Sequence, residues 1–253
     1  MNLKFEYYWY QNALTQQQCS DVIAMGLNKM EENRRKGQSN DGVTYSDNYK
    51  GSKGFDVELG NKTIQEIEKE HGTEAAKSKT YVRDSKIAFL DEQSIYDILW
   101  PLIKRANADT GWHWDIDFCE APQFTVYKEG QFYGWHTDGG SCHNMKYKLN
   151  VPGVTKFSDK EKYSYVFSEN YVGKVRKISC TINLNEGTEY EGGDLMFDMG
   201  QQRTDQFHKV NEIRKAGSMI VFPSFQKHSV QKITKGTRYS LVAWFLGRPW
   251  RWT

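Results

Sequence analysis

The sequence lacks any apolar run of the roughly 18 residues that a membrane-spanning helix requires. Its first residues, MNLKFEYYWYQNALTQQQC, also lack the apolar segment and the small-residue cleavage site of a signal peptide. These two absences predict a cytoplasmic protein without a membrane segment.

Cysteine is scarce and dispersed along the chain. The four cysteines, Cys19, Cys119, Cys142 and Cys180, form no CxxC pair. Disulfide frameworks and zinc sites usually bring cysteines together at short, regular spacings. The sequence therefore favours free thiols in a reducing compartment, and a disulfide framework is the alternative.

An excess of charge of one sign is also missing. The chain has 34 Lys and Arg residues against 32 Asp and Glu residues, which leaves a formal net charge of +2. Partners such as nucleic acid or an anionic membrane usually select a clear basic excess, so the composition disfavours both. Internal repeats and low-complexity segments are absent. The 253 residues are enough to bury a substantial core, and we expect a single domain spanning residues 1–253.

The first half of the chain carries two helical patterns. Thr15 and Gln18 have the spacing of a capping box, and the apolar residues behind them recur at helical intervals, so we expect a helix over about residues 15–35. A second helical pattern covers residues 95–106, where Pro101 is expected to produce a kink. The segments LKFEYYWYQNAL and TYVRDSKIAFL have the character of strands, and TIQEIEKEHGTEAAK that of a short surface helix.

From about residue 116 the chain becomes a series of short strand-like runs separated by glycine turns. The runs are PQFTVYKEG, RKISCTINLNEG, GGDLMFDMG, NEIRKAG, SMIVFPS, HSVQKITKG and TRYSLVAWFLG. Their near-regular spacing predicts an all-β sandwich or barrel for this region rather than an α/β sheet. A polar, tyrosine-rich insertion at residues 139–176 interrupts the runs. Loops of that length usually serve as lids or substrate-binding loops.

The stretch QFYGWHTDGG places His136 and Asp138 two residues apart. On a strand, side chains at that spacing point to the same side, so both could reach one metal ion. Such a pair is common by chance, and an ordinary polar loop is the alternative. His228, at the start of a distant strand-like run, would complete a set of two imidazoles and one carboxylate. That set suits non-haem iron(II), because it leaves positions open for a cosubstrate and oxygen.

Arg238 lies ten residues after His228, inside the strand-like run TRYSLVAWF. A cation among apolar side chains is costly to bury unless it meets an anion. A guanidinium binds a carboxylate through two parallel hydrogen bonds, which suits the far end of a dicarboxylate cosubstrate. An internal ion pair with an Asp or Glu of the protein is the alternative.

Three blocks in order, YKEGQFYGWHTD, EGGDL and HSVQKITKGTRYSLVAW, resemble the conserved blocks of the iron(II)/2-oxoglutarate dioxygenases, in particular their prolyl 4-hydroxylase-like branch. The resemblance covers about residues 120–250, and CSDVIAMGL and VRDSKIAFL extend it more weakly toward the N-terminus. It implies an α+β, mainly β fold. A double-stranded β-helix core (jelly-roll, cupin-like) would span residues 116–250, with helices and strands of residues 1–115 supporting it.

Carried over residue by residue, the resemblance implies that His136, Asp138 and His228 are the iron ligands. It implies that Arg238 holds the remote carboxylate of 2-oxoglutarate. Further residues of the cosubstrate pocket would be Tyr127, Asn183, Leu195 and Trp244. The position of Asn183 is a tyrosine in some members of the branch, so hydrogen bonding to the cosubstrate would differ there.

The resemblance further implies an enzyme that uses Fe(II), 2-oxoglutarate and O2, with ascorbate as an additional candidate. It would hydroxylate a C–H bond and release succinate and CO2. The implied substrate is a prolyl residue of a protein or peptide bound over the 139–176 insertion. A small-molecule 2-oxoglutarate oxygenase, a nucleic-acid demethylase and a non-catalytic cupin-like binder remain as alternatives.

Other histidines and aromatic residues are expected to have structural tasks. Cys142 and His143 lie near Asp138 in sequence, but additional ligands would fill positions that an iron site of this kind keeps open. For Tyr133, lining the cleft and packing in the core are equally expected. The remaining candidates for packing or solvent exposure are His71, His113, His208, Trp112, Trp114, Trp135 and Trp244.

Overall fold

A computed structural model places most of the chain. It describes residues 5–42, 44–45, 48–50, 56–58, 81–139, 174–200 and 206–248, together with Lys69, Thr204 and Trp250. The short helix expected at TIQEIEKEHGTEAAK, the residues His71, Cys142 and His143, and most of the 139–176 insertion lie outside the described residues. The last residues of that insertion already belong to a strand, which begins at Val175.

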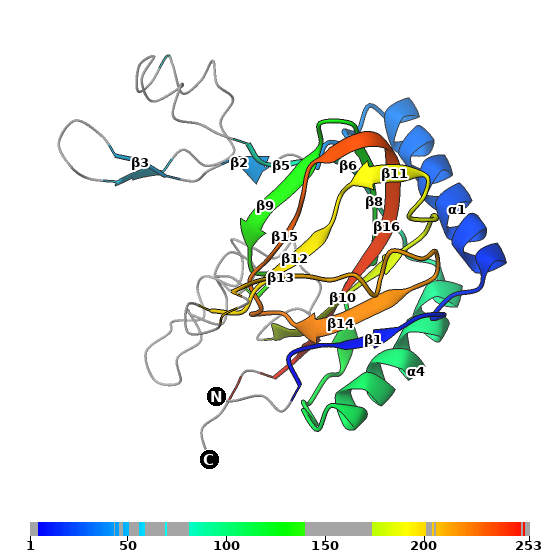
Figure 1. Cartoon of the computed structure of the whole chain (residues 1–253). Coiled ribbons are helices and arrows are strands. Elements are labelled where there is room, and N and C mark those ends of the chain that lie inside the picture. Colours follow the sequence, from blue (N-terminus) through cyan, green and yellow to red (C-terminus); the bar gives the residue numbers. More distant parts are fainter. Residues whose placement is uncertain are drawn as a thin grey trace, which may run out of the picture.

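Two antiparallel sheets form the body of the molecule (Figure 1). The larger sheet has the strand order β1-β14-β10-β16-β8-β6, and β7 and β11 pair with the two ends of β16. Its strands are β1 (Tyr8–Tyr10), β6 (Lys86–Phe89), β7 (Phe118–Cys119), β8 (Gln123–Lys128), β10 (Val175–Asn183), β11 (Tyr190–Gly192), β14 (Met219–Pro223) and β16 (Ile233–Gly247). The long strand β16 pairs with β10 on one side and with β8 on the other, so it runs the length of the structure.

The smaller sheet has the strand order β13-β12-β15-β9-β5-β2. Its strands are β2 (Thr44–Tyr45), β5 (Tyr81–Asp84), β9 (Phe132–His136), β12 (Leu195–Asp198), β13 (Phe207–Lys209) and β15 (His228–Val230). A separate two-stranded sheet pairs β3 (Asn48–Lys50) with β4 (Asp56–Glu58). Ser85 alone links β5 of the smaller sheet to β6 of the larger one.

Two helices cover the outer face of the larger sheet (Figure 1). Helix α1 (Gln16–Arg35) begins with the predicted capping box: the Gln18 amide donates to the Thr15 hydroxyl at 3.2 Å, and the Thr15 amide donates to the Gln18 side chain at 2.8 Å. Helix α4 (Gln93–Asp109) continues through Pro101. Both predicted helices are therefore confirmed, as is the mainly β architecture with supporting helices.

Apolar side chains pack in two layers. One cluster lies between the helices and the larger sheet and includes Leu99, Ile103, Phe124, Leu241 and Phe245. A second cluster lies between the two sheets and includes Leu195, Phe197, Ile220, Phe222 and Ile233. This second layer borders the cavity described below, since Leu195 and Phe222 also line that cavity.

The predicted strand at NEIRKAG is wrong, because residues 211–217 form turns. The guanidinium of Arg214 donates to the backbone carbonyls of Gly187, Tyr190 and Gly192. Gly217 adopts a φ of +78°, a conformation that glycine takes without steric cost. These contacts hold the segment as a loop over β11 in place of a ladder of strand pairing.

Candidate metal centre and its cavity

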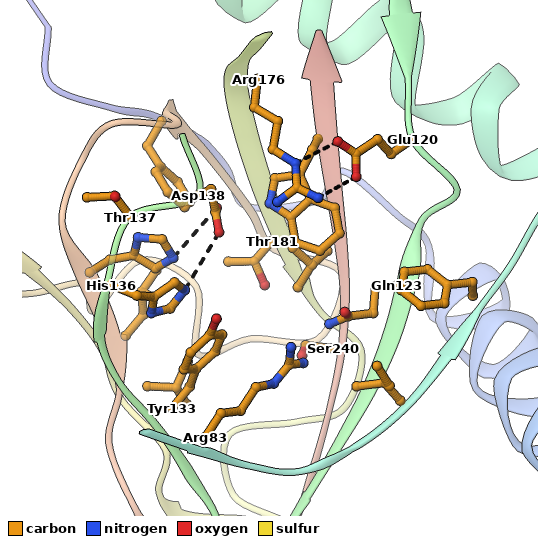
Figure 2. Close-up of a pocket in the computed structure, with 18 of the residues that line it drawn as sticks. Arg83, Glu120, Gln123, Tyr133, His136, Thr137, Asp138, Arg176, Thr181 and Ser240 are labelled. Carbon is orange, nitrogen blue, oxygen red and sulfur yellow. Dashed lines mark hydrogen bonds and ion pairs between the residues drawn. The ribbon is translucent and has the colours of Figure 1, made fainter. Parts of the chain in front are cut away.

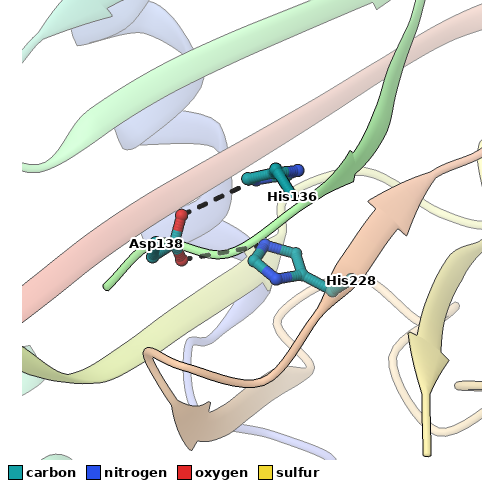
Figure 3. Close-up of side chains that lie close together, drawn as sticks. All are labelled: His136, Asp138 and His228. Carbon is teal, nitrogen blue, oxygen red and sulfur yellow. Dashed lines mark ion pairs between the residues drawn. The ribbon is translucent and has the colours of Figure 1, made fainter. Parts of the chain in front are cut away.

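Three side chains predicted to bind metal meet at one point. His136 ends β9 and lies directly opposite His228 at the start of β15, while Asp138 follows in the turn after β9. The ligand atoms of the three residues all lie within 4.8 Å of one another. The Nε2 atoms of His136 and His228 are 3.6 and 3.7 Å from the two carboxylate oxygens of Asp138 (Figure 3).

Backbone carbonyls fix both imidazole rings in the same way. Nδ1 of His136 lies 2.8 Å from the carbonyl oxygen of Gly134, and Nδ1 of His228 lies 2.9 Å from that of Gln226. A carbonyl can only accept, so each Nδ1 carries the proton and each Nε2 keeps a free lone pair. Both lone pairs are then available on the side of Asp138, which is the orientation that metal-binding histidines take.

The protonation states of the three residues favour a bound cation. Burial would by itself raise the pKa of Asp138, but His228, His136 and Arg176 outweigh it and hold that pKa well below its usual range. Burial lowers the pKa of His228 to about 4, so its ring is neutral at neutral pH. Oδ2 of Asp138 is buried and has no hydrogen-bond partner among the described residues. A buried charged oxygen without a partner is costly, so the donor set fits a divalent metal such as Fe(II).

Tyr133 supports this site from one side. Its ring stacks on that of His136, with centroids 3.5 Å apart, and burial raises the pKa of its hydroxyl to about 12. Trp135 lies between the two in sequence and points away, with 37% of its surface exposed. Tyr133 has both roles expected for it, because it lines the cleft and also packs against the apolar cluster between the sheets.

A cavity of about 610 Å³ opens beside the three residues (Figure 2). Alternate residues of β16 form one wall, namely Arg238, Ser240, Val242, Trp244 and Leu246. Between them, Leu241, Ala243 and Phe245 face the helices and belong to the core. The strand period of two therefore separates a lining face from a packing face over residues 238–246 of β16.

Arg238 is buried at the cavity wall and is 2% exposed. Its Nη1 lies 3.4 Å from the Ser240 hydroxyl, and its guanidinium carbon lies 5.8 Å from the ring centroid of Tyr127. None of the carboxylates in the described part of the chain forms an ion pair with it, so the internal ion pair considered above finds no partner there. Tyr127, Leu195 and Trp244, three further predicted pocket residues, also line the cavity.

Asn183 does not line this cavity, contrary to its predicted place. Its amide nitrogen donates to the carbonyl oxygens of Asn185 and Arg214, and its amide oxygen accepts a hydrogen bond from the Tyr190 hydroxyl. Because Asn183 is the last residue of β10, its side chain is used to anchor the turns that follow. Thr181, two residues earlier on the same face of β10, lines the cavity instead.

A buried ion pair in the cavity wall was not predicted from the sequence. Arg176 binds both carboxylate oxygens of Glu120, with Nε 2.6 Å from Oε1, and its guanidinium carbon lies 4.0 Å from the ring centroid of Trp244. The register of β10 against β16 shifts between Arg176 and Ile178. This bulge turns Arg176 toward the cavity, and no local sequence signal marks it.

A second unpredicted cation is Arg83, on β5. It is 9% exposed, its Nε donates to the Ser85 hydroxyl at 3.0 Å, and its guanidinium carbon lies 4.7 Å from the ring centroid of Tyr133. It lines the same cavity (Figure 2). The argument applied to Arg238, a cation inside an alternating strand, could have identified it in TYVRDSKIAFL.

Two of the histidines given structural tasks, His113 and His208, do not line the cavity. His113 is exposed, and His208 is hydrogen-bonded to the Tyr7 hydroxyl at 3.1 Å. The three described cysteines, Cys19, Cys119 and Cys180, are buried free thiols, as predicted. Among the described residues, no helix has the length and apolar character to span a bilayer.

Comparison with known proteins also indicates an iron(II) site, as the geometry does. Residues 122–246 match the family model of the 2OG-Fe(II) oxygenase superfamily. A PKHD-type hydroxylase of Xylella fastidiosa is 31% identical over 123 residues, which is 49% of this chain and 43% of that protein. A PKHD-type hydroxylase of Picosynechococcus is 31% identical over 121 residues, which is 48% of this chain and 39% of that protein. The chain thus matches less than half the length of these relatives.

Solved structures resemble this one over nearly its whole length. A prolyl-4-hydroxylase of Pseudomonas putida superposes with a TM-score of 0.54 at 17% identity, covering 97% of this chain and 95% of that one. A viral collagen prolyl hydroxylase from Paramecium Bursaria Chlorella virus-1, in complex with 2OG, gives 0.53 at 15% identity, covering 96% and 97%. At such identities the likeness concerns the fold, and it confirms the double-stranded β-helix expected from the sequence.

Proposed function

Because residues 122–246 match the family model of the 2OG-Fe(II) oxygenase superfamily, we propose that this chain is an iron(II)- and 2-oxoglutarate-dependent dioxygenase that hydroxylates a C–H bond. The observation that carries the proposal is the convergence of His136, Asp138 and His228 in a cavity that also holds Arg238, which pairs with none of the described carboxylates. In the overall reaction one atom of O2 enters the substrate as a hydroxyl group. The other enters succinate, which forms from 2-oxoglutarate with loss of CO2.

Three residues of this chain would bind the metal. His136 and His228 would bind Fe(II) through Nε2, and Asp138 would bind it through its carboxylate. When bound, the iron supplies the oxygen chemistry, while the protein supplies positioning and electrostatics. Each Nδ1 keeps its proton and donates it in a hydrogen bond to a backbone carbonyl, so the rings would hold their orientation throughout turnover.

Arg238 would hold the remote carboxylate of 2-oxoglutarate. Its guanidinium is buried, and the Ser240 hydroxyl beside it offers a further hydrogen-bond donor. Charge-assisted pairing in a site closed to water is stronger than the same pairing in solvent. Tyr127 lies opposite Arg238 on the paired strand β8 and would contact the carbon backbone of the cosubstrate.

The proposed substrate is a prolyl residue of a protein or peptide, bound over the 139–176 segment. Supporting it are the likeness to PKHD-type hydroxylases and the prolyl hydroxylase folds that superpose on this chain. A free metabolite is the second candidate, because Arg83 lines the cavity without an ion pair to any described carboxylate and could bind a small acid.

The test combines cosubstrate turnover with product mass. The protein, loaded with Fe(II), is incubated with 2-oxoglutarate, O2 and a set of proline-containing peptides. Succinate is measured together with any mass gain of one oxygen atom. Succinate formation that rises with a peptide, and an oxidised peptide, support the proposal. Turnover only with free metabolites transfers the activity to a small-molecule oxygenase. Absence of 2-oxoglutarate consumption under all conditions rejects the dioxygenase.

A further inference from the structure

The cavity contains more positive charge than the proposed cosubstrate can neutralise. Four basic residues line it, and two of them already have partners. Arg176 is paired with Glu120, and Lys174 lies 2.9 Å from Asp117. The other two, Arg83 and Arg238, form no ion pair with any carboxylate that the structure describes.

One of these two cations is accounted for by the proposed function. A divalent iron bound to Asp138 would retain one positive charge, and Arg238 contributes another. The two carboxylates of 2-oxoglutarate balance that sum. Among the described residues and the proposed ligands, no opposite charge is then left for Arg83, although it is nine-tenths buried.

The neighbours of Arg83 do not replace an anion. The Ser85 hydroxyl accepts one hydrogen bond from its Nε and is itself neutral. The Tyr133 ring under the guanidinium offers a cation–π contact, which is attractive but carries no net charge. An uncompensated buried cation is costly, so its position at a cavity wall indicates that an anionic group of a ligand completes it.

Resting on the proposed function, we propose that Arg83 binds a carboxylate of the substrate that is hydroxylated. The substrate class is thereby a carboxylic acid whose reacting carbon lies a short distance from the acid group. Arg83 is well placed for this task, because Tyr133 lies between its guanidinium and the ring of His136 in one stack. A substrate held by Arg83 would therefore extend along Tyr133 toward the metal ligands (Figure 2).

The carboxylate could belong to a small acid or to an acidic residue beside a prolyl residue in a peptide. Matched pairs that differ only in the acid group separate these sources. The small-molecule arm uses N-acetyl-L-proline and N-acetyl-L-prolinamide. The peptide arm uses acetyl-Ala-Pro-Asp-amide and acetyl-Ala-Pro-Asn-amide. Binding is measured by calorimetry on the full chain, loaded anaerobically with Mn(II) and saturating 2-oxoglutarate so that Arg238 is occupied.

We expect the acid to bind at least about 10-fold more tightly than its amide in one arm, because a guanidinium pairs with a carboxylate and not with a neutral amide. That arm identifies the source. Arg83→Gln should bring acid and amide within about threefold of each other, and Arg83→Lys should retain part of the preference. Lys174→Gln is the matched control: it removes a cation of the same cavity that already has a partner, and the preference should persist.

Equal affinities of acid and amide in both arms, including the absence of binding, overturn the proposal. So does an acid preference that survives Arg83→Gln. Circular dichroism of each variant confirms folding before titration. The result is independent of turnover: an Arg83-dependent acid preference without succinate formation would leave this site standing and reject the proposed function.

Discussion

His136 and His228 face each other across two neighbouring strands, with their ring centroids 4.1 Å apart. The pairing of β9 with β15 fixes this arrangement, because directly opposed residues on antiparallel strands bring their side chains together. Asp138 completes the set from the turn that follows β9. The site is therefore built on two rigid strands and one short turn, and each of its three members can be tested separately.

Replacing His136 by Ala should abolish iron-dependent succinate formation and weaken divalent metal binding by about 100-fold or more, since one of three protein ligands is lost. The side chain is 14% exposed, so the effect on unfolding should be modest. Calorimetric titration with Mn(II) and a succinate assay check this. His113→Ala, at an exposed position apart from the cavity, is the control. Succinate production at the native rate would show that His136 is not a ligand.

Replacing Arg238 by Gln should leave metal binding intact while weakening 2-oxoglutarate binding by about 100-fold, because a buried bidentate partner of a carboxylate is removed. Titration of the Mn(II)-loaded variant with 2-oxoglutarate measures the change. Arg105→Gln, which removes an exposed guanidinium paired with Asp109 on α4, should have no effect. An unchanged affinity for 2-oxoglutarate would assign Arg238 a purely structural task.

The metal-free protein should lose stability as the pH falls from 6.5 toward 4. Burial lowers the pKa of His228 from 6.5 to about 4. Within that window the unfolded chain binds a proton at this residue and the folded chain does not, so protonation favours unfolding by at most about 1.4 kcal/mol per pH unit. Urea unfolding in the presence of a chelator measures the slope. His228→Gln should reduce it, and an identical slope in that variant would contradict the assignment.

Replacing Glu120 by Ala should destabilise the protein by about 3 kcal/mol, because it leaves the guanidinium of Arg176 buried without its partner. Denaturant unfolding gives the free energy. Glu191→Ala is the control: it breaks the exposed pair with Lys235, which should cost less than about 1 kcal/mol. A loss no greater than in this control would mean that solvent reaches Arg176.

Replacing Gly26 by Ala should destabilise the protein even though alanine favours helices by about 1 kcal/mol. A Cβ at this position would lie 2.2 Å from Cδ1 of Phe124, so α1 would have to move away from β8. Overpacking of this kind costs about 1–3 kcal/mol. Thermal unfolding measures the change, and Ser20→Ala on the exposed side of α1 should be neutral or stabilising. A gain of stability in Gly26→Ala would show that the helix shifts freely.

Local signals in the sequence were sufficient for several features. The capping box at Thr15 defines the start of α1 because its hydrogen bonds close within four residues. The order of His136, Asp138, His228 and Arg238 along the chain, together with the family resemblance, predicted that the first three meet and that Arg238 lies in the same cavity.

Features that depend on distant contacts were beyond the sequence. Arg176 lines the cavity because the pairing of β10 with β16 shifts its register after this residue. Asn183 does not line the cavity because its side chain is hydrogen-bonded to Arg214 and Tyr190, which lie in other segments of the chain. For Arg83 the local pattern marks a cation inside an alternating strand, but its place in this cavity depends on the pairing of β5 with β9, two strands far apart in the chain. The role of each of these side chains depends on a contact with a distant segment, and one stretch of sequence does not reveal such a contact.

The chain crosses between the two sheets at Ser85, and this has a consequence for how the protein could diverge. Ser85 is fully buried, and its hydroxyl donates to the carbonyl oxygen of Gly42. The link between β5 and β6 therefore cannot accommodate an added or a missing residue. Inserting or deleting one residue would turn Arg83 or Ile87 from the inside of the barrel to the outside. Selectivity at this corner can therefore diversify by exchanging the side chain at position 83, while the length of the crossing stays constant.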